Sequence, residues 1–292
     1  MGVYKTAYLS IGSNLGNRGL LLQKAIFEIG RKAGEIRQVS AIYETPSWGF
    51  EAEDFLNACL EIQTLLTPEK LLTTILEIEA NFGRLRNNSE GYQSRTLDID
   101  IIYYEKEIIK TQSLTIPHPK LQERKFILKP LADISPQFYH PIFNKDTRNL
   151  LQECKDKSIL TKRTIKLFIN RHSLFASFNY LAIEGNIGAG KTTLATKISD
   201  EFNAKLILER FAENPFLPSF YEDQARYAFP LEMSFLADRY QQFTEDTNQL
   251  DLFKSFMVSD YDIYKSLIFA KVTLQQNEFE LYRKVFNFMY KE

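Results

Sequence analysis

Apolar and polar positions along the first hundred residues follow a period of two in several segments and a helical period in two others. Helical spacing of apolar residues covers 20–29 and again 67–83. Thr67 followed by Pro68 is a favoured helix start, and Gly83 is expected to end that helix. Strand-like segments cover residues 4–11, 36–45, 55–66 and 95–104. The order βαββαβ predicts an α+β ferredoxin-like sandwich, an antiparallel sheet with both helices on one side.

Two carboxylates in the last of these strands need an explanation. Side chains alternate between the two faces of a strand, so Asp98 and Asp100 share one face. One interpretation is a half-exposed strand whose acids meet water. The other is a Mg²⁺ site for a bound polyphosphate, because Arg84, Arg86 and Arg95 are close in sequence. Guanidinium groups bind phosphate oxygens, and the phosphates complete the coordination of the cation, so these arginines favour the second interpretation.

A second strand–helix unit begins near residue 180. An apolar run, "YLAI", leads into "EGNIGAGKTT", and a helical pattern follows at once. This is the P-loop in the context it requires: backbone N–H groups and the helix N-terminus surround phosphates, the lysine reaches the terminal ones and the threonine hydroxyl meets Mg²⁺. The motif residues are Gly185, Gly188, Gly190, Lys191 and Thr192.

The length of 292 residues suggests two domains. We predict an N-terminal domain in residues 1–160, a charged and irregular linker in 161–178, and a partial α/β P-loop kinase domain in 179–292. The net charge of −1 gives no indication of a nucleic-acid surface. Two cysteines and three histidines without paired spacing argue against disulfides and a zinc site. No apolar run or secretory pattern indicates a membrane partner or export, so we expect a cytoplasmic protein.

Six motifs in residues 7–131 carry a family resemblance. They are, in order, "YLSIGSNLGNR", "IYETPSWG", "FLNACLEI", "GRLRN", "RTLDIDI" and "IPHPKLQERKFILKPL". The set resembles 6-hydroxymethyl-7,8-dihydropterin pyrophosphokinase of folate biosynthesis. The resemblance implies transfer of a diphosphoryl group from ATP to the hydroxymethyl oxygen of the pterin, with release of AMP.

The resemblance also implies roles for individual residues. Asp98 and Asp100 would be the ligands of two Mg²⁺ ions, and Arg84 and Arg95 would neutralise charge on the transferred phosphoryl groups. The expected ATP contacts are Arg86, Thr115, His118 and Arg124. The expected pterin contacts are Thr45, Pro46, Phe55, Asn57 and Phe126, where the two aromatic rings would stack on the pterin. Taken singly, these aromatic residues, His118 and Asn57 would be interpreted as structural.

Two loop positions depart from the family pattern. Trp48 stands where a smaller apolar residue is frequent, and Tyr92 stands where a tryptophan is familiar, in a slightly longer loop. Both changes concern loop closure over ATP, so we expect them to affect rate and affinity more than the type of reaction.

The chain from residue 178 onward resembles the deoxynucleoside kinases in "EGNIGAGKTTL", "LERFAENPFLPSFYED", "FPLEMSFLADRY" and "SDYDIYKSLIFAK". The resemblance implies that Glu209 is the general base for a sugar 5′-hydroxyl. Glu232 replaces a glutamine used for base recognition, and Asp260-Tyr261-Asp262 replaces an acidic-Arg-Ser arrangement. The sequence stops at Glu292, before the last core strand, the arginine-rich lid and the adenine-holding loop of that family, so we expect this half not to be an active kinase by itself.

The main hypothesis is therefore an ATP- and Mg²⁺-dependent pterin pyrophosphokinase joined to an incomplete nucleoside-kinase-like segment. A second hypothesis is that deoxynucleoside 5′-phosphorylation is the chief activity. A third is that the C-terminal segment is a non-catalytic module for nucleotide binding or homo-oligomer formation. A Lys191→Ala change discriminates among these by its effect on ATP binding and assembly.

Overall fold

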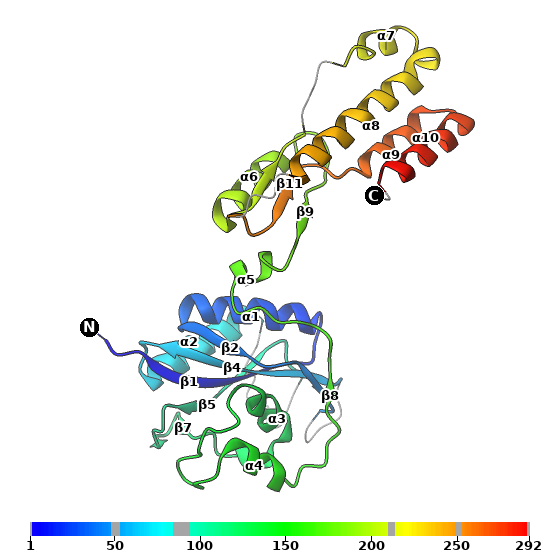
Figure 1. Cartoon of the computed structure of the whole chain (residues 1–292). Coiled ribbons are helices and arrows are strands. Elements are labelled where there is room, and N and C mark those ends of the chain that lie inside the picture. Colours follow the sequence, from blue (N-terminus) through cyan, green and yellow to red (C-terminus); the bar gives the residue numbers. More distant parts are fainter. Residues whose placement is uncertain (1, 48–52, 84–93, 210–213, 249–252, 291–292) are drawn as a thin grey trace. The chain divides into compact units, whose positions relative to one another are not determined.

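The computed structural model describes residues 2–47, 53–83, 94–209, 214–248 and 253–290. Contacts divide the chain into a first unit, Met1–Leu174, and a second unit, Phe175–Glu292 (Figure 1). Each unit has its own sheet and its own hydrophobic clusters. Within the described residues, none of the helices has the length and apolar character needed to cross a bilayer.

The first unit is built on an antiparallel sheet with strand order β5-β1-β4-β3-β8, and β2 also pairs with β4. The bounds are β1 Lys5–Ser13, β2 Glu35–Val39, β3 Tyr43–Thr45, β4 Phe55–Thr64, β5 Asp98–Tyr104 and β8 Thr161–Lys162. The segment predicted as one strand over 36–45 is thus two strands. Ser40 lies between them, and its N–H donates to the Cys59 carbonyl at 3.0 Å.

Helices α1 (Arg18–Lys32) and α2 (Pro68–Asn81) cover one face of this sheet, as the sequence predicts. The Asn17 side chain caps α1 and the Thr67 side chain caps α2, each by accepting a backbone N–H of the first turn. The core on this face joins alternate residues of β1, including Leu9 and Ile11, to the apolar stripes of both helices. The predicted ferredoxin-like arrangement is confirmed on this face.

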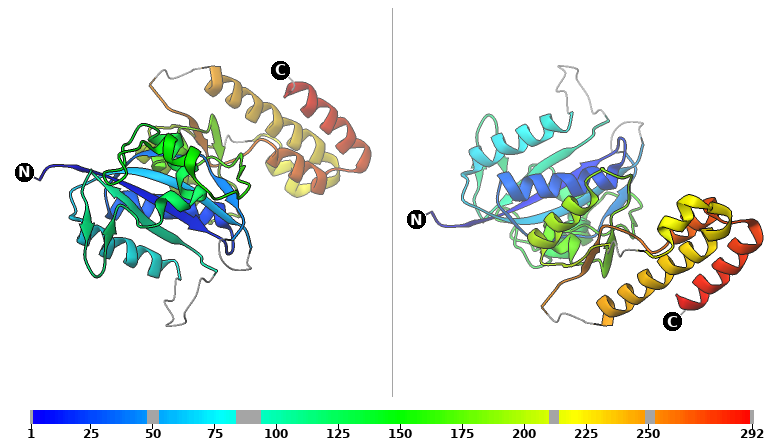
Figure 2. Two further views of the ribbon diagram at one scale, coloured as in Figure 1. Left: turned by 90° about the horizontal axis from the view of Figure 1, so that it is seen from below. Right: turned by 90° about the horizontal axis from the view of Figure 1, so that it is seen from above.

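The opposite face carries helices that the sequence pattern does not predict: α3 (Lys125–Ile134) and α4 (Thr147–Glu153). Figure 1 shows the sheet between these helices and the α1–α2 layer, and the two views of Figure 2 are taken from its opposite sides. Tyr8, Cys59 and Tyr103 point to this side and pack with Ile127 and Leu131 of α3. Both faces of the central strands are therefore buried.

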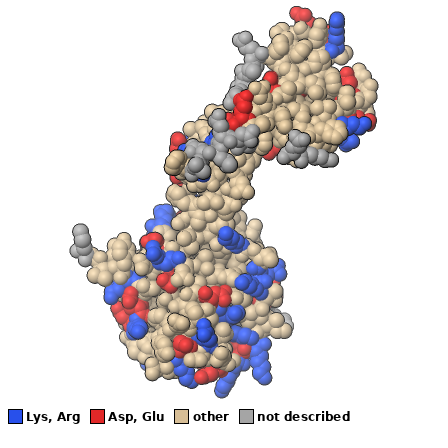
Figure 3. Space-filling model, viewed as in Figure 1, with Lys and Arg blue, Asp and Glu red and all other residues tan. Residues whose placement is uncertain are grey.

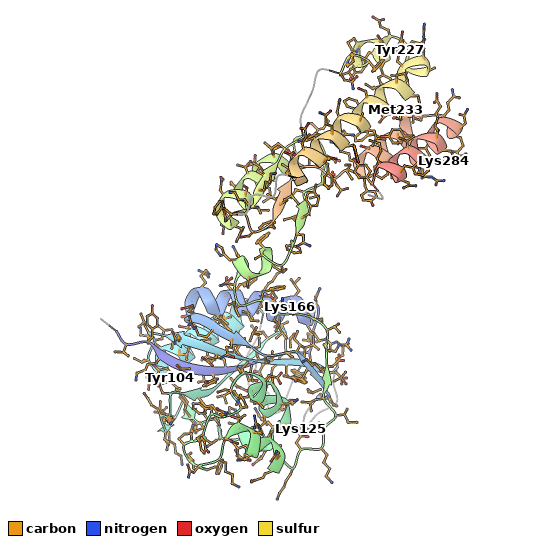
Figure 4. All side chains as sticks on the ribbon, in the orientation of Figure 1. Tyr104, Lys125, Lys166, Tyr227, Met233 and Lys284 are labelled. Carbon is orange, nitrogen blue, oxygen red and sulfur yellow. The ribbon has the colours of Figure 1, made fainter. Side chains whose placement is uncertain are left out.

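Two short strands, β6 (Ile109–Lys110) and β7 (Thr115–Ile116), form a hairpin beyond β5. A 3₁₀ turn, Leu121–Glu123, leads into α3. At the far end of β5 the Tyr104 hydroxyl donates to the Leu66 carbonyl at 2.8 Å, and Figure 4 labels this residue and Lys125 at the start of α3. The His118 N–H donates to the Ile102 carbonyl at 3.0 Å, which holds the returning segment against β5.

Part of the expected linker packs on the first unit. Strand β8 pairs with β3, and the Arg163 N–H donates to the Ile42 carbonyl at 2.9 Å. Leu167 belongs to the first core, and the Gln23 side chain both donates to and accepts from the backbone of Phe168. Residues 161–169 thus differ from the predicted linker, and a short helix, α5 (Arg171–Phe175), follows them.

The second unit contains a parallel sheet of order β10-β11-β9, with β9 Tyr180–Ala182, β10 Lys205–Ile207 and β11 Met257–Ser259. The helices are α6 Lys191–Phe202, α7 Leu217–Glu222, α8 Gln224–Asn248, α9 Lys265–Thr273 and α10 Gln276–Met289. Helix α6 packs on the sheet, and α8, α9 and α10 share a separate cluster that includes Met233 (Figure 4). This is the partial P-loop α/β fold that the sequence predicts.

Candidate active site

A cavity of about 460 Å³ opens in the first unit at the ends of β1, β3, β4 and β5. Every predicted residue of the N-terminal site that the structure describes lines it: Thr45, Pro46, Phe55, Asn57, Arg95, Asp98, Asp100, Thr115, His118, Arg124 and Phe126. Arg84, Arg86, Trp48 and Tyr92 lie outside the described residues. Side chains from positions 45 to 126 thus meet in one cavity.

Asp98 and Asp100 occupy alternate positions of β5 and both face this cavity. The Arg95 Nη1 atom lies 2.7 Å from Asp98 Oδ2, and the Arg124 Nη1 atom lies 3.5 Å from Asp100 Oδ2. Burial, followed by the neighbouring Asp98 carboxylate, raises the pKa of Asp100 above its ordinary value. The two described arginines of the cavity wall match the two carboxylates in number, and burial still disfavours the charged form of Asp100.

His118 is a neutral imidazole beside this pair. Burial, with a further contribution from the Arg124 guanidinium, lowers its pKa to about 4. Its Nδ1 accepts the N–H of Lys120 at 3.3 Å, so the proton of the neutral ring is on Nε2. That Nε2 lies 4.0 Å from Asp100 Oδ2 and points a hydrogen-bond donor toward the carboxylate side of the cavity.

The other side of the cavity is shaped by buried amide, hydroxyl and aromatic groups. Asn57 is 4% exposed, and its Nδ2 donates to Thr45 Oγ1 at 2.9 Å. Phe55 lines this side from β4, while Phe126 lines it from α3, where the Arg124 guanidinium carbon lies 5.6 Å from the Phe126 ring centroid. Such a wall can hold a flat heterocycle by ring contacts and a few directed hydrogen bonds.

Gly12 of β1 is a cavity residue that sequence reasoning missed. It pairs with Asn57 across the β1–β4 ladder, and an added Cβ would lie 2.8 Å from Asn57 Oδ1. Only glycine leaves room for the amide at this point. The signal in the sequence was the "IGSN" run, but the partner is 45 positions away and depends on strand register.

Asn14 is a second missed residue, and it organises the start of the carboxylate strand. It is fully buried; its Oδ1 accepts the Arg95 N–H at 2.6 Å, and its own N–H donates to the Arg95 carbonyl at 3.1 Å. Its Nδ2 donates to Ser94 Oγ at 3.1 Å and to the Glu53 carbonyl at 3.3 Å. One side chain thus joins three segments at the cavity rim.

The donor set suits a hard cation that brings further oxygen ligands with it. Within the residues that the structure describes, no group of three or more His, Cys, Asp or Glu side chains could hold a metal by itself. Two carboxylates on one strand face, one with a raised pKa, leave most coordination positions for other ligands. Mg²⁺ is bound in this way, by one or two carboxylates together with phosphate oxygens and water.

The second unit has a cavity of about 1440 Å³, lined by the P-loop, Glu209 and Glu232 among others. Gly188 and Gly190 have φ of 77° and 82°, the left-handed region that glycine adopts without strain. The Thr192 hydroxyl donates to Asp260 Oδ2 at 2.5 Å, and Asp260 directly follows β11. The predicted loop residues therefore lie together at the C-terminal edge of the parallel sheet.

The carboxylate predicted as a general base is held by two cations. Glu209 accepts from Arg239 Nη2 at 2.9 Å and from Lys265 Nζ at 2.8 Å. Burial raises the pKa of Glu209, but the hydrogen bonds from Lys265 and Arg239 outweigh it, so the net pKa is lowered. Cations from α8 and α9 thus stand beside Glu209, although the Asp260–Asp262 segment lacks the family arginine.

Glu232 lies deeper, at 5% exposure, and accepts the Thr273 hydroxyl at 2.9 Å. Burial raises its pKa, so this carboxyl is more readily neutral than an exposed glutamate. A carboxyl at this position presents different donors and acceptors from the glutamine that the family resemblance implies.

Comparisons with known proteins agree with this geometry. Residues 8–136 match the family model of 7,8-dihydro-6-hydroxymethylpterin-pyrophosphokinase, and residues 181–292 match that of deoxynucleoside kinase. The 2-amino-4-hydroxy-6-hydroxymethyldihydropteridine pyrophosphokinase of Aquifex aeolicus is 40% identical over 149 residues, which is 51% of this chain and 91% of the relative. The enzyme of the same name from Methylorubrum extorquens is 44% identical over 133 residues, 44% of this chain and 82% of the relative.

A third relative of that name, from Synechocystis, is 38% identical over 148 residues, covering 50% of this chain and 75% of the relative. The match to the Aquifex protein spans nearly all of that relative at 40% identity. Through its first unit, the chain belongs to the 7,8-dihydro-6-hydroxymethylpterin-pyrophosphokinase family.

Proposed function

We propose that the first unit transfers the terminal diphosphoryl group of ATP to 6-hydroxymethyl-7,8-dihydropterin, in folate biosynthesis. The hydroxymethyl oxygen attacks the β-phosphorus and forms the new P–O bond. The bond from that phosphorus to the oxygen shared with the α-phosphate breaks, so AMP leaves and the hydroxyl proton is released. The observation that carries the proposal is the single cavity in which a carboxylate pair with arginines faces a ring-binding wall.

The ring-binding wall would orient the acceptor. Phe55 and Phe126 would contact the faces of the pterin, and the buried Asn57 amide would hydrogen-bond its edge. The Thr45 hydroxyl already accepts from Asn57 Nδ2, which leaves Asn57 Oδ1 available for a ring N–H. Fixing the acceptor next to the phosphate end of the cavity lowers the entropic cost of bringing the two substrates together.

The charged wall would bind the nucleotide. Asp98 and Asp100 would hold Mg²⁺, which when bound acts as a Lewis acid on the phosphoryl oxygens. Arg95 and Arg124 lie beside these carboxylates and would contact phosphate oxygens, and the His118 Nε2–H would donate to the same region. As the family resemblance implies, Arg84 would act with Arg95 to neutralise charge on the transferred phosphoryl groups, and Arg86 and Thr115 would contact ATP.

The test is nucleotide analysis after incubation with ATP, Mg²⁺ and the hydroxymethyl-dihydropterin. We expect AMP to form only with the pterin and to be lost in the Asp98→Asn and Asp100→Asn variants. Lys191→Ala, in the other unit, is the control and should leave AMP formation unchanged. Formation of ADP without pterin, and no AMP, would rule the proposal out.

We propose nucleoside phosphorylation as a second candidate function, located in the second unit. It is favoured by one cavity that contains the P-loop, Glu209 and the buried Glu232. ADP formation with deoxynucleosides that Lys191→Ala abolishes would support it. ATP binding without turnover would favour a nucleotide-binding module, and a change in molar mass in solution caused by the same substitution would favour a role in self-association.

A further inference from the structure

Glu79 is a buried acid that the proposed mechanism leaves without a role. It lies in the last turn of α2 at 1% exposure, and no other acidic residue in the described part of the first unit is buried. Burying a carboxylate is costly unless its oxygens are hydrogen-bonded. A glutamate at such a position is therefore expected to accept a hydrogen bond from a specific buried donor.

The donor to Glu79 is a backbone N–H group between the two aspartates of β5. Its Oε1 accepts the backbone N–H of Ile99 at 2.8 Å, and Ile99 is the residue between Asp98 and Asp100. A second hydrogen bond lies close by: the hydroxyl of Thr96, two residues before β5, donates at 2.7 Å to the carbonyl of Phe82, the C-cap residue of α2.

The position of β5 in the sheet explains why this contact matters. Among the described strands, β5 ends the sheet and pairs only with β1, so no described strand is a partner for its outer backbone groups. The Glu79 carboxylate takes the place of that partner at Ile99. Because neighbouring side chains leave a strand on opposite faces, the orientation of the Ile99 peptide sets the direction of both flanking carboxylates.

The helix that carries Glu79 also forms part of the cavity wall. Leu72 and Leu76 line the cavity and lie on the same face of α2 as Glu79, seven and three residues before it. The wall and the strand are therefore held in a fixed relation by one element.

We propose that Glu79 is a positioning residue that holds the edge strand so that Asp98 and Asp100 converge on a divalent cation and its nucleotide. This inference rests on the proposed pyrophosphokinase function. This role requires only a side-chain oxygen that accepts the Ile99 N–H. Glutamine at position 79 should therefore preserve cation binding, whereas an apolar side chain of similar size should not.

The experiment measures Mn²⁺ binding by electron paramagnetic resonance, with the α,β-methylene analogue of ATP present. The variants are Glu79→Gln, which keeps the acceptor, and Glu79→Met, which removes it without opening a large cavity. Glu77→Met is the matched control, because Glu77 is exposed on the same helix. Melting temperatures, kcat and the KM for pterin are measured on the same samples, with binding assayed below the lowest melting temperature.

We expect Glu79→Met to weaken Mn²⁺ binding about tenfold, as the loss of one buried hydrogen bond predicts, while Glu79→Gln stays within about threefold of the wild type. The kcat should fall in Glu79→Met with an unchanged KM for pterin. A folded Glu79→Met protein with wild-type Mn²⁺ affinity would overturn the inference. So would a Glu79→Gln protein that loses affinity, a result that is decisive even if the methionine variant does not fold.

The two proposals fail in different ways. A wild-type protein that makes no AMP from ATP and pterin would refute the proposed function without any reference to Glu79. A wild type that is active, together with Mn²⁺ affinities that do not respond to the acceptor, would refute the positioning role alone.

Discussion

Gly12→Ala is the substitution whose effect can be worked out most directly from the structure. The added Cβ would lie 2.8 Å from Asn57 Oδ1, whereas ordinary contact begins at 3.4 Å, so the amide would have to retreat. Asn57 has little room, because it is 4% exposed and its Nδ2 is bonded to Thr45 Oγ1 at 2.9 Å. Overpacking of this kind costs about 1–3 kcal/mol.

If that cost falls on the pterin wall, the Kd for the pterin should rise roughly fivefold to a hundredfold. The assay is fluorescence titration with the hydroxymethyl-dihydropterin, alongside thermal unfolding. Gly30→Ala in α1 is the control, because its added Cβ would meet only Ile36 Cγ1 at 3.6 Å, an ordinary contact. We expect the control to bind pterin normally and to gain up to about 1 kcal/mol of stability from helix propensity.

The reasoning would be refuted by a Gly12→Ala protein whose pterin Kd matches that of the wild type. It would also be refuted if Gly30→Ala weakened pterin binding to the same degree, since the effect would then not come from the close approach to Asn57. A loss of stability without a loss of affinity would locate the strain in the strand pair rather than in the cavity.

Three further predictions concern other parts of the chain. Asn14→Ala should lower kcat by about tenfold or more, because Arg95 loses a buried backbone partner, and Asn14→Asp should retain more activity, as steady-state kinetics will show. Burial lowers the pKa of His118 to about 4, so between about pH 6.5 and pH 4 the unfolded chain binds a proton at this residue and the folded chain does not. The free energy of unfolding should therefore decrease as the pH is lowered from 7 to 4.5. Urea titrations at these two pH values should show a decrease that is smaller by about 2–3 kcal/mol in His118→Gln than in the wild type. Lys191→Ala should remove one of two binding events for a fluorescent ATP analogue and leave AMP formation unchanged. If the substitution abolished AMP formation together with that binding event, the two nucleotide sites would not be separate.

The elements that the sequence predicts are those governed by local periodicity. The stripe on 67–83 becomes α2, with Thr67 as its cap, and the alternation around Asp98 becomes β5 with both acids on one face. The P-loop is likewise local, since its glycines, lysine and threonine are contiguous. These features depend on neighbours within a few residues, which one sequence displays directly.

The features that the sequence does not reveal depend on register and on distant partners. Gly12 meets Asn57 only because β1 and β4 pair in one register. Asn14 holds Arg95 across 81 positions, and Glu79 reaches Ile99 across 20. The salt bridges of Glu209 to residues of α8 and α9 are of the same kind. No local pattern encodes such contacts.

The short strand β8 determines where the two halves of this chain can be separated. A recombinant fragment that stopped at residue 160 would strip the partner from the outer edge of β3, the strand that carries Thr45 into the cavity. It would also remove Leu167 from the first core. Bare strand edges and uncovered apolar residues promote self-association. A fragment carried through residue 174 keeps both, so it is the one to use for crystallising or titrating the pterin site by itself.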